Sequence, residues 1–275
     1  MGSFPETIPG LPEDAGLGRV AGMESTCADH WTDSHNHLQL RWDGAGLAEM
    51  LDARGTARCV VNATREEDWD RVAAMAAACP HRIVAAYGIH PWHAAVAADG
   101  WEDRLRSRLT ADPRATVGEC GLDGLAAADA TAQMRVFLAH LRIARDFGRV
   151  VTVHCVRAWG GLLDGLAEMP PPGLLMHGYG GSLETAARLV KMGAYFSCNG
   201  RMFGPRAGKS PEVFRHLPPD RMVVESDFGA EQDGNPADVA ETGAGLASLL
   251  AMELDELRAR VESNASRLFA NAFGN

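Results

Sequence analysis

The chain has 275 residues, 46% of them hydrophobic, and a formal net charge of −10 from 36 acidic residues against 26 lysines and arginines. This length is enough to bury a full core, and parallel α/β barrels of this size are commonly one domain. The acidic balance argues against an extended footprint on nucleic acid or on an anionic membrane. It still admits a short phosphate ester, because bound metal ions reverse the charge locally.

Targeting signals and a disulfide framework are both missing from the sequence. No charged segment precedes an apolar one at the amino terminus, and no long uninterrupted apolar run occurs, so we expect neither secretion nor a membrane span. The cysteines include no Cys-x-x-Cys pair and occur at positions 27, 59, 79, 120, 155 and 198. We expect reduced thiols in a cytoplasmic protein, a monomer or weak dimer with no membrane partner.

Residues 1–29 read as an amino-terminal extension. They are rich in Gly, Pro and acidic residues and show no sustained periodicity. We expect disorder or a loose strap here, and a single catalytic domain over residues 30–275. Met23 is an alternative start of the biological chain, and one sequence leaves that choice open.

From Trp31 onward, short apolar segments alternate with helical ones. The helices are clearest at Thr131–Phe147, where apolar residues recur at i, i+3, i+4 and i+7, and at Leu254–Phe269. Successive strand centres are about 20 to 35 residues apart, close to the length of a βαβ unit. Strands are predicted around Asp33 and at Cys59–Val61, Ile83–Tyr87, Ala115–Val117, Val150–Val153, Gly173–Met176, Ala194–Ser197 and Met222–Val224.

Eight strand–helix units favour an α/β fold built as a single closed (β/α)₈ TIM barrel. The alternative is an open, doubly wound sheet. No Gly-x-Gly-x-x-Gly motif follows an early strand, which argues against that alternative.

His35 and His37 are the most informative pair in the sequence. Side chains two residues apart on a strand point to the same side, so both imidazoles can bind one metal ion. Alone, the spacing is weak evidence, because surface or core histidines also produce it. The pair gains weight because five further polar residues each follow a later predicted strand: His90, Glu119, His154, His177 and Asp227. Together they predict a metal centre at the mouth of the barrel.

His90 lies between Gly88 and Pro91, in a turn that follows the third strand. The proline favours an extended or turning backbone at His90, and the glycine permits a close approach. One interpretation is a solvated turn histidine. The functional interpretation places His90 against an anionic oxygen of the substrate.

Glu119 follows the fourth strand and stands next to Gly118. Burial of an unpaired carboxylate is costly, and bridging two cations with its two oxygens would offset that cost. Asp123 has two equal interpretations, as a helix N-cap and as a supporting acceptor near the site. Cys120 directly follows Glu119, so strand alternation is expected to turn its thiol away, as it is for Cys155 after His154.

His154 and His177 end the fifth and sixth strands, and Glu225 and Asp227 follow the eighth. Each histidine taken singly fits a buried, hydrogen-bonded core residue. Their equivalent positions on successive strands favour metal ligation instead. We expect one of the two carboxylates to ligate while the other supports.

Together these residues resemble the TatD-type metal-dependent hydrolases, a branch of the amidohydrolase-like barrel enzymes. The resemblance runs in order from about residue 31 to 270. The ordered set is specific, although each piece is weak. The matching pieces are Asp33–His37, Gly88–Pro91, Gly118–Asp123, His154, His177, Glu225–Asp227 and a terminal helix signature at Asn264–Phe269.

The resemblance implies a dinuclear site with two divalent ions, and magnesium, manganese and zinc are the cofactors of the family. His35, His37 and Asp227 would hold one metal, His154 and His177 the other, and Glu119 would bridge them. His90 would face the substrate. The family includes phosphodiesterases, especially DNases that act from strand ends.

The chain also departs from the commoner family pattern. Val156 and Trp159 stand where many relatives carry Arg and a second His, and Tyr179-Gly180-Gly181 and Phe228-Gly229 also differ. These departures make a DNase activity less secure than a hydrolase activity. Arg157 and Trp92 are the further residues predicted to bind substrate. Gly200–Gly208, with Arg201, Arg206 and the nearby Lys209, is predicted either as a mobile basic loop over the site or as a solvated turn.

The leading hypothesis is a two-metal hydrolase of a nucleic-acid end or a small phosphoester, with a metal-bridging hydroxide attacking phosphorus. Asp227 would accept the nucleophile's proton, Glu119 would hold the metals, and His90 would stabilise oxyanion charge. A second hypothesis keeps the metals and cleaves an amide, a lactone or another carbonyl ester. A third is a non-catalytic binding subunit of a larger complex, which predicts eroded ligands, and none of the six is lost.

Overall fold

A computed structural model describes residues 31–274 except for 128, 205–207, 209 and 230–237. The extension predicted over residues 1–29, with Met23, lies outside the described residues, as do Cys27, Arg206 and Lys209. No helix among the described residues is both long enough and apolar enough to cross a membrane.

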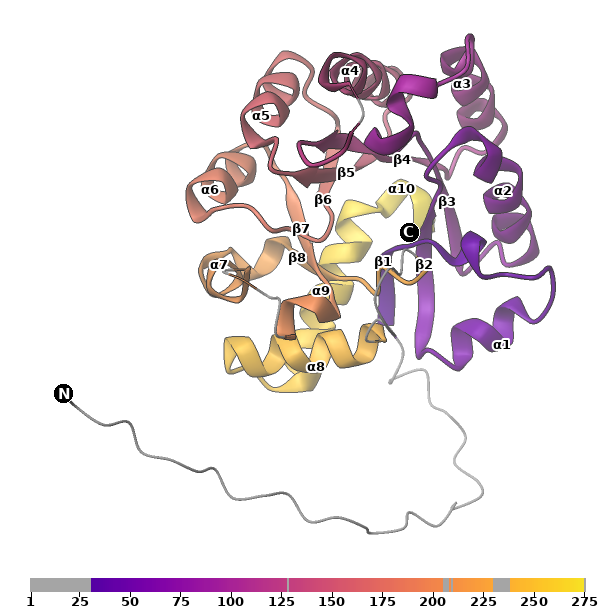
Figure 1. The fold of residues 1–275 in the computed structure, drawn as a ribbon. Helices are drawn as coiled ribbons and strands as arrows, with labels where there is room; N and C mark the ends of the chain where they lie inside the picture. The colour runs from indigo at the N-terminus through magenta and orange to yellow at the C-terminus, as the bar shows by residue number, and fades with distance from the viewer. Residues whose placement is uncertain (1–30, 128, 205–207, 209, 230–237, 275) are drawn as a thin grey trace.

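Eight parallel strands form one sheet in which each strand pairs with the next in chain order (Figure 1). The order never reverses, so the barrel prediction is confirmed and the doubly wound alternative is wrong. The strands are β1 (Trp31–Asn36), β2 (Thr56–Asn62), β3 (Ile83–Tyr87), β4 (Thr116–Asp123), β5 (Val150–Val156), β6 (Gly173–Met176), β7 (Tyr195–Cys198) and β8 (Met222–Val224).

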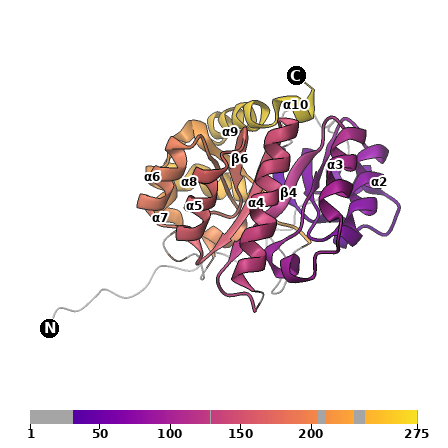
Figure 2. The same ribbon diagram turned by 90° about the horizontal axis from the view of Figure 1, so that it is seen from above.

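Helices surround the strands on the outside of the barrel (Figure 2). The first seven α-helices are α1 (Leu47–Asp52), α2 (Trp69–Ala78), α3 (Trp101–Ala111), α4 (Ala130–Phe147), α5 (Trp159–Glu168), α6 (Leu183–Lys191) and α7 (Ser210–His216). The last three are α8 (Val239–Leu250), α9 (Leu254–Leu268) and α10 (Ala270–Phe273). Short 3-10 turns follow several strands, among them η2 (Leu38–Leu40), η3 (Glu66–Asp68), η4 (Pro91–Val96) and η5 (Gly200–Phe203), whereas η6 (Pro219–Arg221) leads into β8.

Helix α4 shows how local sequence sets its bounds. The Asp129 side chain accepts a hydrogen bond from the Thr131 amide at the amino end, and Gly148 ends the helix with φ of 66°. The apolar face then packs inward, as the i, i+3, i+4 pattern predicts. Helix α9 agrees with its predicted range to one residue.

The barrel closes where β1 meets the segment that follows β8. The amide of Asp227 donates to the carbonyl of His35 at 3.1 Å, and the amide of His37 donates to the carbonyl of Phe228 at 2.6 Å. Beneath them, the buried Asp33 carboxylate accepts from the Ser226 amide at 2.9 Å and from its hydroxyl at 2.6 Å. Closure therefore brings the first and last predicted site segments together.

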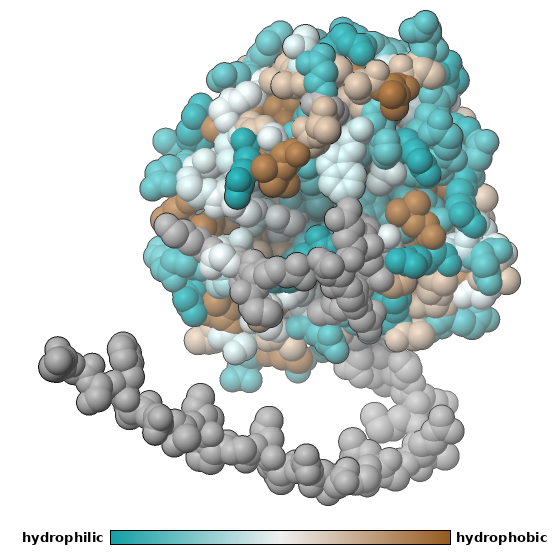
Figure 3. All heavy atoms as spheres, in the orientation of Figure 1, coloured by the Kyte–Doolittle hydropathy of each residue, from teal (hydrophilic) through white to brown (hydrophobic). Residues whose placement is uncertain are grey.

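The end of the barrel opposite the strand carboxyl termini is apolar. Helices α9 and α10 lie across it (Figure 2), and Phe269 packs there without solvent exposure. One cluster joins this helical cap to the strands and contains Val60, Val84, Ala86, Leu175, Val223, Ala265, Leu268, Phe269 and Ala272. The face drawn in Figure 3 is mostly hydrophilic with scattered hydrophobic residues, in keeping with the acidic composition.

Candidate metal centre

His35 and His37 lie side by side at the carboxyl end of β1. Their Nε2 atoms are 3.2 Å apart, and both side chains are buried. Nδ1 of His37 lies 2.7 Å from the carbonyl oxygen of Asn62, which accepts but cannot donate. The hydrogen of a neutral His37 therefore sits on Nδ1, and Nε2 is left with a lone pair directed at the site.

Glu119 occupies the middle of the site and presents one oxygen to each histidine pair. Oε2 lies 3.5 Å from Nε2 of His35 and 3.2 Å from Nε2 of His37. Oε1 lies 3.1 Å from Nδ1 of His154 and 2.9 Å from Nε2 of His177. The carboxylate thus stands between two separate donor sets, as expected for a bridging ligand.

The glycines beside Glu119 explain how β4 reaches this position. The pairing of β4 with β5 shifts between Val117 and Cys120, and Gly118 and Gly121 have φ of 148° and 142°. A Cβ on Gly121 would lie 2.0 Å from the carbonyl oxygen of His154, so only glycine permits this approach. The strand predicted to end at Val117 therefore continues to Asp123, because the shifted segment pairs again with β5.

Asp227 closes the site from the β8 side. Its Oδ1 lies 3.7 Å from Nε2 of both His35 and His37, and it is buried without a hydrogen-bond partner among the described residues. Its Oδ2 lies 3.3 Å from Nη1 of Arg201. Asp227 follows the end of β8 with φ of 51°, so a left-handed turn, rather than strand alternation, aims its side chain.

Glu225 takes the supporting position. It accepts hydrogen bonds from the Ser197 hydroxyl and from Nδ2 of Asn199 at 3.0 Å, and it lies 3.5 Å from Nδ1 of His177. A carboxylate behind the second nitrogen of a histidine fixes the ring and leaves the other nitrogen to bind. This arrangement agrees with the prediction that one carboxylate binds at the site and the other supports it.

His90 faces Glu119 from the turn after β3. Its Nε2 lies 3.5 Å from Oε1 of Glu119, and its Nδ1 accepts from the Trp92 amide at 3.2 Å. Burial lowers the pKa of His90 to about 3, so the imidazole is neutral. Because Nδ1 accepts, the single ring hydrogen lies on Nε2 and points into the site.

Asp123 does not cap a helix, because α4 begins at Ala130 with Asp129 as its cap; it caps a turn instead and also lies beside the site. Its Oδ1 accepts from the backbone amides of Leu125 and Ala126, which caps the turn after β4. Its Oδ2 accepts from Nε1 of Trp92 at 2.6 Å and lies 3.5 Å from Nε2 of His154. The neighbouring imidazole of His154 holds the pKa of Asp123 below its usual range. The Trp92 side chain is thereby fixed beside His90 with half of its surface exposed.

The electrostatics of the site favour a cation. Burial alone would raise the pKa of Glu119, but the surrounding imidazoles, His177 foremost, outweigh it and hold that pKa well below the usual value. Burial likewise opposes protonation of His177, yet Glu119 raises the pKa of His177 well above its usual value. An ionised carboxylate here requires positive charge beside it, which either imidazolium groups or metal ions supply.

The donor atoms fit divalent metal ions. Three groups of His, Asp and Glu place their ligand atoms within 4.8 Å of one another, and no cysteine belongs to these groups of described residues. Imidazole nitrogens suit zinc, and carboxylate oxygens suit magnesium or manganese. The three groups are His35, His37 and Glu119; His35, His177 and Asp227; and His90, Glu119 and His154.

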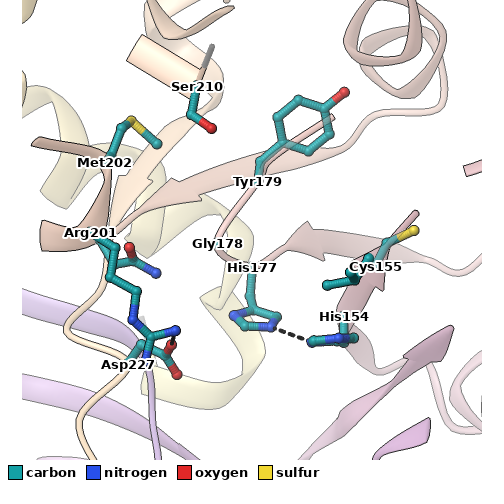
Figure 4. Close-up of a pocket in the computed structure, with 11 residues that line it drawn as sticks. His154, Cys155, His177, Gly178, Tyr179, Arg201, Met202, Ser210 and Asp227 are labelled. Atoms are coloured by element: carbon teal, nitrogen blue, oxygen red, sulfur yellow. Dashed lines mark hydrogen bonds and ion pairs between the residues drawn. The ribbon is translucent and has the colours of Figure 1, made fainter. Parts of the chain in front are cut away.

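A cavity of about 200 Å³ opens beside the site between β5, β6, β7 and the segment after β8. Figure 4 shows His154 and His177 at its base, with Arg201 and Asp227 on one side and Tyr179 on the other. Arg157 is exposed and has φ of 49°, and it is not among the lining residues. Arg201 is the arginine that reaches the site. Arg206 and Lys209 lie outside the described residues, so the mobile basic loop over Gly200–Gly208 stays a prediction.

Two supporting residues escaped sequence reasoning. The Asn62 carbonyl orients His37, and Asn199 holds Glu225. Asn62 ends a buried strand, as the histidines do, and Asn199 directly follows one. A search for every polar residue at a strand end, instead of ligand types alone, would have found Asn199, whereas Asn62 acts through its backbone carbonyl, which any residue would supply.

Comparison with known proteins identifies the family. The model of the TatD related DNase family matches residues 32–270, and the chain belongs to this family. An uncharacterized metal-dependent hydrolase of Haemophilus influenzae is 26% identical over 264 residues, which cover 88% of this chain and 100% of the relative. A 3′-5′ ssDNA/RNA exonuclease, TatD, of Citrobacter koseri is 26% identical over 68% of this chain and 77% of its own length.

A solved structure supports the same assignment. YjjV, a TatD homologue from Escherichia coli, matches with a TM-score of 0.78 and 26% identity over 88% of this chain and 99% of that one. The resemblance stated from the sequence is therefore confirmed. The chain is a metal-dependent hydrolase, which goes against the alternative of a non-catalytic binding subunit.

Proposed function

We propose that the centre holds two divalent cations, one on each side of Glu119. His35, His37, Asp227 and Oε2 of Glu119 would hold the first, and His154, His177 and Oε1 of Glu119 the second. The observation that carries this proposal is the division of the Glu119 oxygens between two histidine pairs. Magnesium, manganese or zinc would, when bound, activate water and offset negative charge on the substrate.

The protein's own groups would then orient the substrate and move the proton. Nε2–H of the neutral His90 would donate to an anionic oxygen of the substrate, where charge develops during attack. Asp227 would accept the proton of the attacking water. Burial raises the pKa of Asp227 above its ordinary value, which makes it a better base.

We infer that the substrate is a phosphodiester, and specifically one end of a single-stranded nucleic acid or a small phosphoester. The relative from Citrobacter koseri is named for action on single-stranded DNA and RNA. The cavity of about 200 Å³ is smaller than a typical ligand pocket, so it accepts an end instead of a duplex. The half-exposed, hydrogen-bonded Trp92 offers a ring on which a base can stack.

A substrate panel tests this proposal. Purified protein, stripped by chelation and reloaded with magnesium, manganese or zinc, is assayed with p-nitrophenyl phosphodiesters, DNA oligomers blocked at the 3′ or the 5′ end, and lactones. We expect metal-dependent cleavage of the phosphodiesters and of oligomers with one free end. Turnover of lactones without any phosphodiester cleavage would contradict the proposal and favour the carbonyl-ester alternative.

A further inference from the structure

Arg201 stands at the wall of the cavity next to the proposed metal centre. It lies in η5, directly after β7, and Nη1 is 3.3 Å from Oδ2 of Asp227. Figure 4 shows its guanidinium between Asp227 and the open cavity, on the side of His177. Among the described residues that line this cavity, Arg201 is the one lysine or arginine.

The contact with Asp227 does not account for an arginine at this position. The Arg201 side chain is 59% exposed although Asp227 is buried, and an ion pair whose cation stands in water contributes little to folding. A guanidinium has five N–H donors in a planar fork, and the ion pair with Asp227 engages one edge of it. The exposed part can therefore donate to a ligand in the cavity.

The rest of the lining indicates which ligand would use those donors. Beyond the site residues it is made of uncharged side chains, including Val156, Tyr179, Met202 and Ser210. Arg157 lies outside the lining, so within the described residues an anion in the cavity would meet one guanidinium. A fork of donors suits the paired oxygens of a phosphoryl group, whereas a neutral ester offers one weak acceptor.

We infer that Arg201 binds the anionic phosphoryl oxygens of the substrate and makes the cavity selective for phosphate esters over neutral esters. This inference rests on the proposed function, because it names the specificity residue of the same site. Oδ1 of Asp227 is directed at His35 and His37, while Oδ2 faces Arg201. The Asp227 carboxylate would therefore hold the guanidinium that binds the phosphoryl group next to the proposed metal ligands.

Ligand binding tests the inference without relying on turnover. Isothermal titration measures the affinity of the metal-loaded protein for thymidine 5′-monophosphate and for thymidine, its uncharged counterpart. We expect Arg201→Met to weaken binding of the monophosphate by about 10- to 100-fold, the loss of one charge-assisted interaction, and to leave thymidine binding unchanged. Arg201→Lys should recover part of the loss, since it keeps the charge and lacks the fork.

A matched control and the metal content separate the possible outcomes. Arg215→Met removes an exposed arginine that pairs with Glu212 on α7, and it should change neither affinity. Equal monophosphate affinity in wild type and Arg201→Met, or no binding to wild type, would overturn the inference. So would a loss of metal from Arg201→Met with equal weakening of both ligands, because Arg201 would then only hold Asp227. If the protein cleaved no phosphodiester but its affinity for the monophosphate still depended on Arg201, the proposed function would fail and the inference about Arg201 would stand.

Discussion

The two ends of the barrel are built from the same strands and have opposite chemistry. At the carboxyl ends, charged and polar side chains are buried together, and several of their atoms have no hydrogen-bond partner within the part of the chain that the structure describes, among them Oδ1 of Asp227 and Nδ1 of His35. At the amino ends, Val60, Val223 and Phe269 pack in an apolar cluster beneath α9 and α10. Burying unpaired polar groups costs stability, and burying apolar surface provides it.

The contrast shows how one fold tolerates a functional site whose buried polar groups lower its stability. The apolar amino end and the core between strands and helices supply stability. That stability offsets the cost of burying several imidazoles and carboxylates together at the carboxyl end. Substitutions at the two ends should therefore separate activity from stability.

The largest effect is expected from Glu119→Gln at the polar end. Loss of the negative charge between the two histidine pairs should lower kcat/KM by at least about 10³-fold and reduce the bound metal, because a neutral amide cannot bridge two cations. The melting temperature should change little. Steady-state kinetics and metal analysis provide the check, with the exposed Glu212→Gln as control. Unchanged turnover in Glu119→Gln would refute the bridging role.

The opposite pattern is expected from Phe269→Ala at the apolar end. Phe269 is fully buried and packs edge to face on Phe273, with ring centroids 5.7 Å apart. Its truncation should cost about 3 to 5 kcal/mol of unfolding free energy and leave kcat/KM of the folded enzyme close to wild type. Chemical denaturation measures the loss. Leu254→Ala on α9, where the side chain is 42% exposed, should stay within about 0.5 kcal/mol.

Two results would contradict this division of roles between the two ends. One is a Phe269→Ala protein that is fully folded but inactive. The other is a loss of unfolding free energy in Leu254→Ala as large as that in Phe269→Ala.

A smaller, pH-dependent effect is expected at His140, which lies on α4 behind the turn that carries His90. The Ile89 amide donates to Nε2 of the buried His140 at 3.2 Å, and Nδ1 lies 2.7 Å from the Val136 carbonyl. The ring must therefore be neutral, and burial lowers its pKa from 6.5 to about 4. The folded state binds fewer protons than the unfolded state between these values, so stability is present above pH 6.5 and is lost as the pH falls toward 4.

The measurement compares wild type with His140→Gln at pH 7 and pH 4.5. Other titrating groups are common to both proteins and cancel in the difference. We expect the wild-type advantage in unfolding free energy to shrink by about 2 to 3 kcal/mol at the lower pH. A constant advantage across this range would show that His140 is not held neutral by the fold.

The barrel and most of the site were predictable because their signals are local. Apolar runs at regular spacing located the strands, and polar residues at the ends of five of them predicted the six proposed ligands. The course of β4 was not predictable, because it depends on the close approach of Gly121 to the His154 backbone, which periodicity does not record. The sequence pointed to Arg157 as the arginine that binds substrate. The folded structure brings Arg201 to the site instead, through its contact with Asp227, which is 26 residues away in the sequence.

The closed barrel was predicted, but the contacts that close it were hidden for the same reason. The Asp33 carboxylate and Ser226 are 193 residues apart in sequence and form a pair of hydrogen bonds at the seam. Nothing in the local sequence around Asp33 distinguishes this role from that of a metal ligand.

The most direct test of the central claim is the location of bound metal in crystals of the manganese-loaded protein, measured by anomalous diffraction at the manganese edge. We predict two peaks, one beside Oε2 of Glu119 with His35, His37 and Asp227, and one beside Oε1 with His154 and His177. A single peak, or peaks that leave Glu119 beyond bonding distance, would contradict the account.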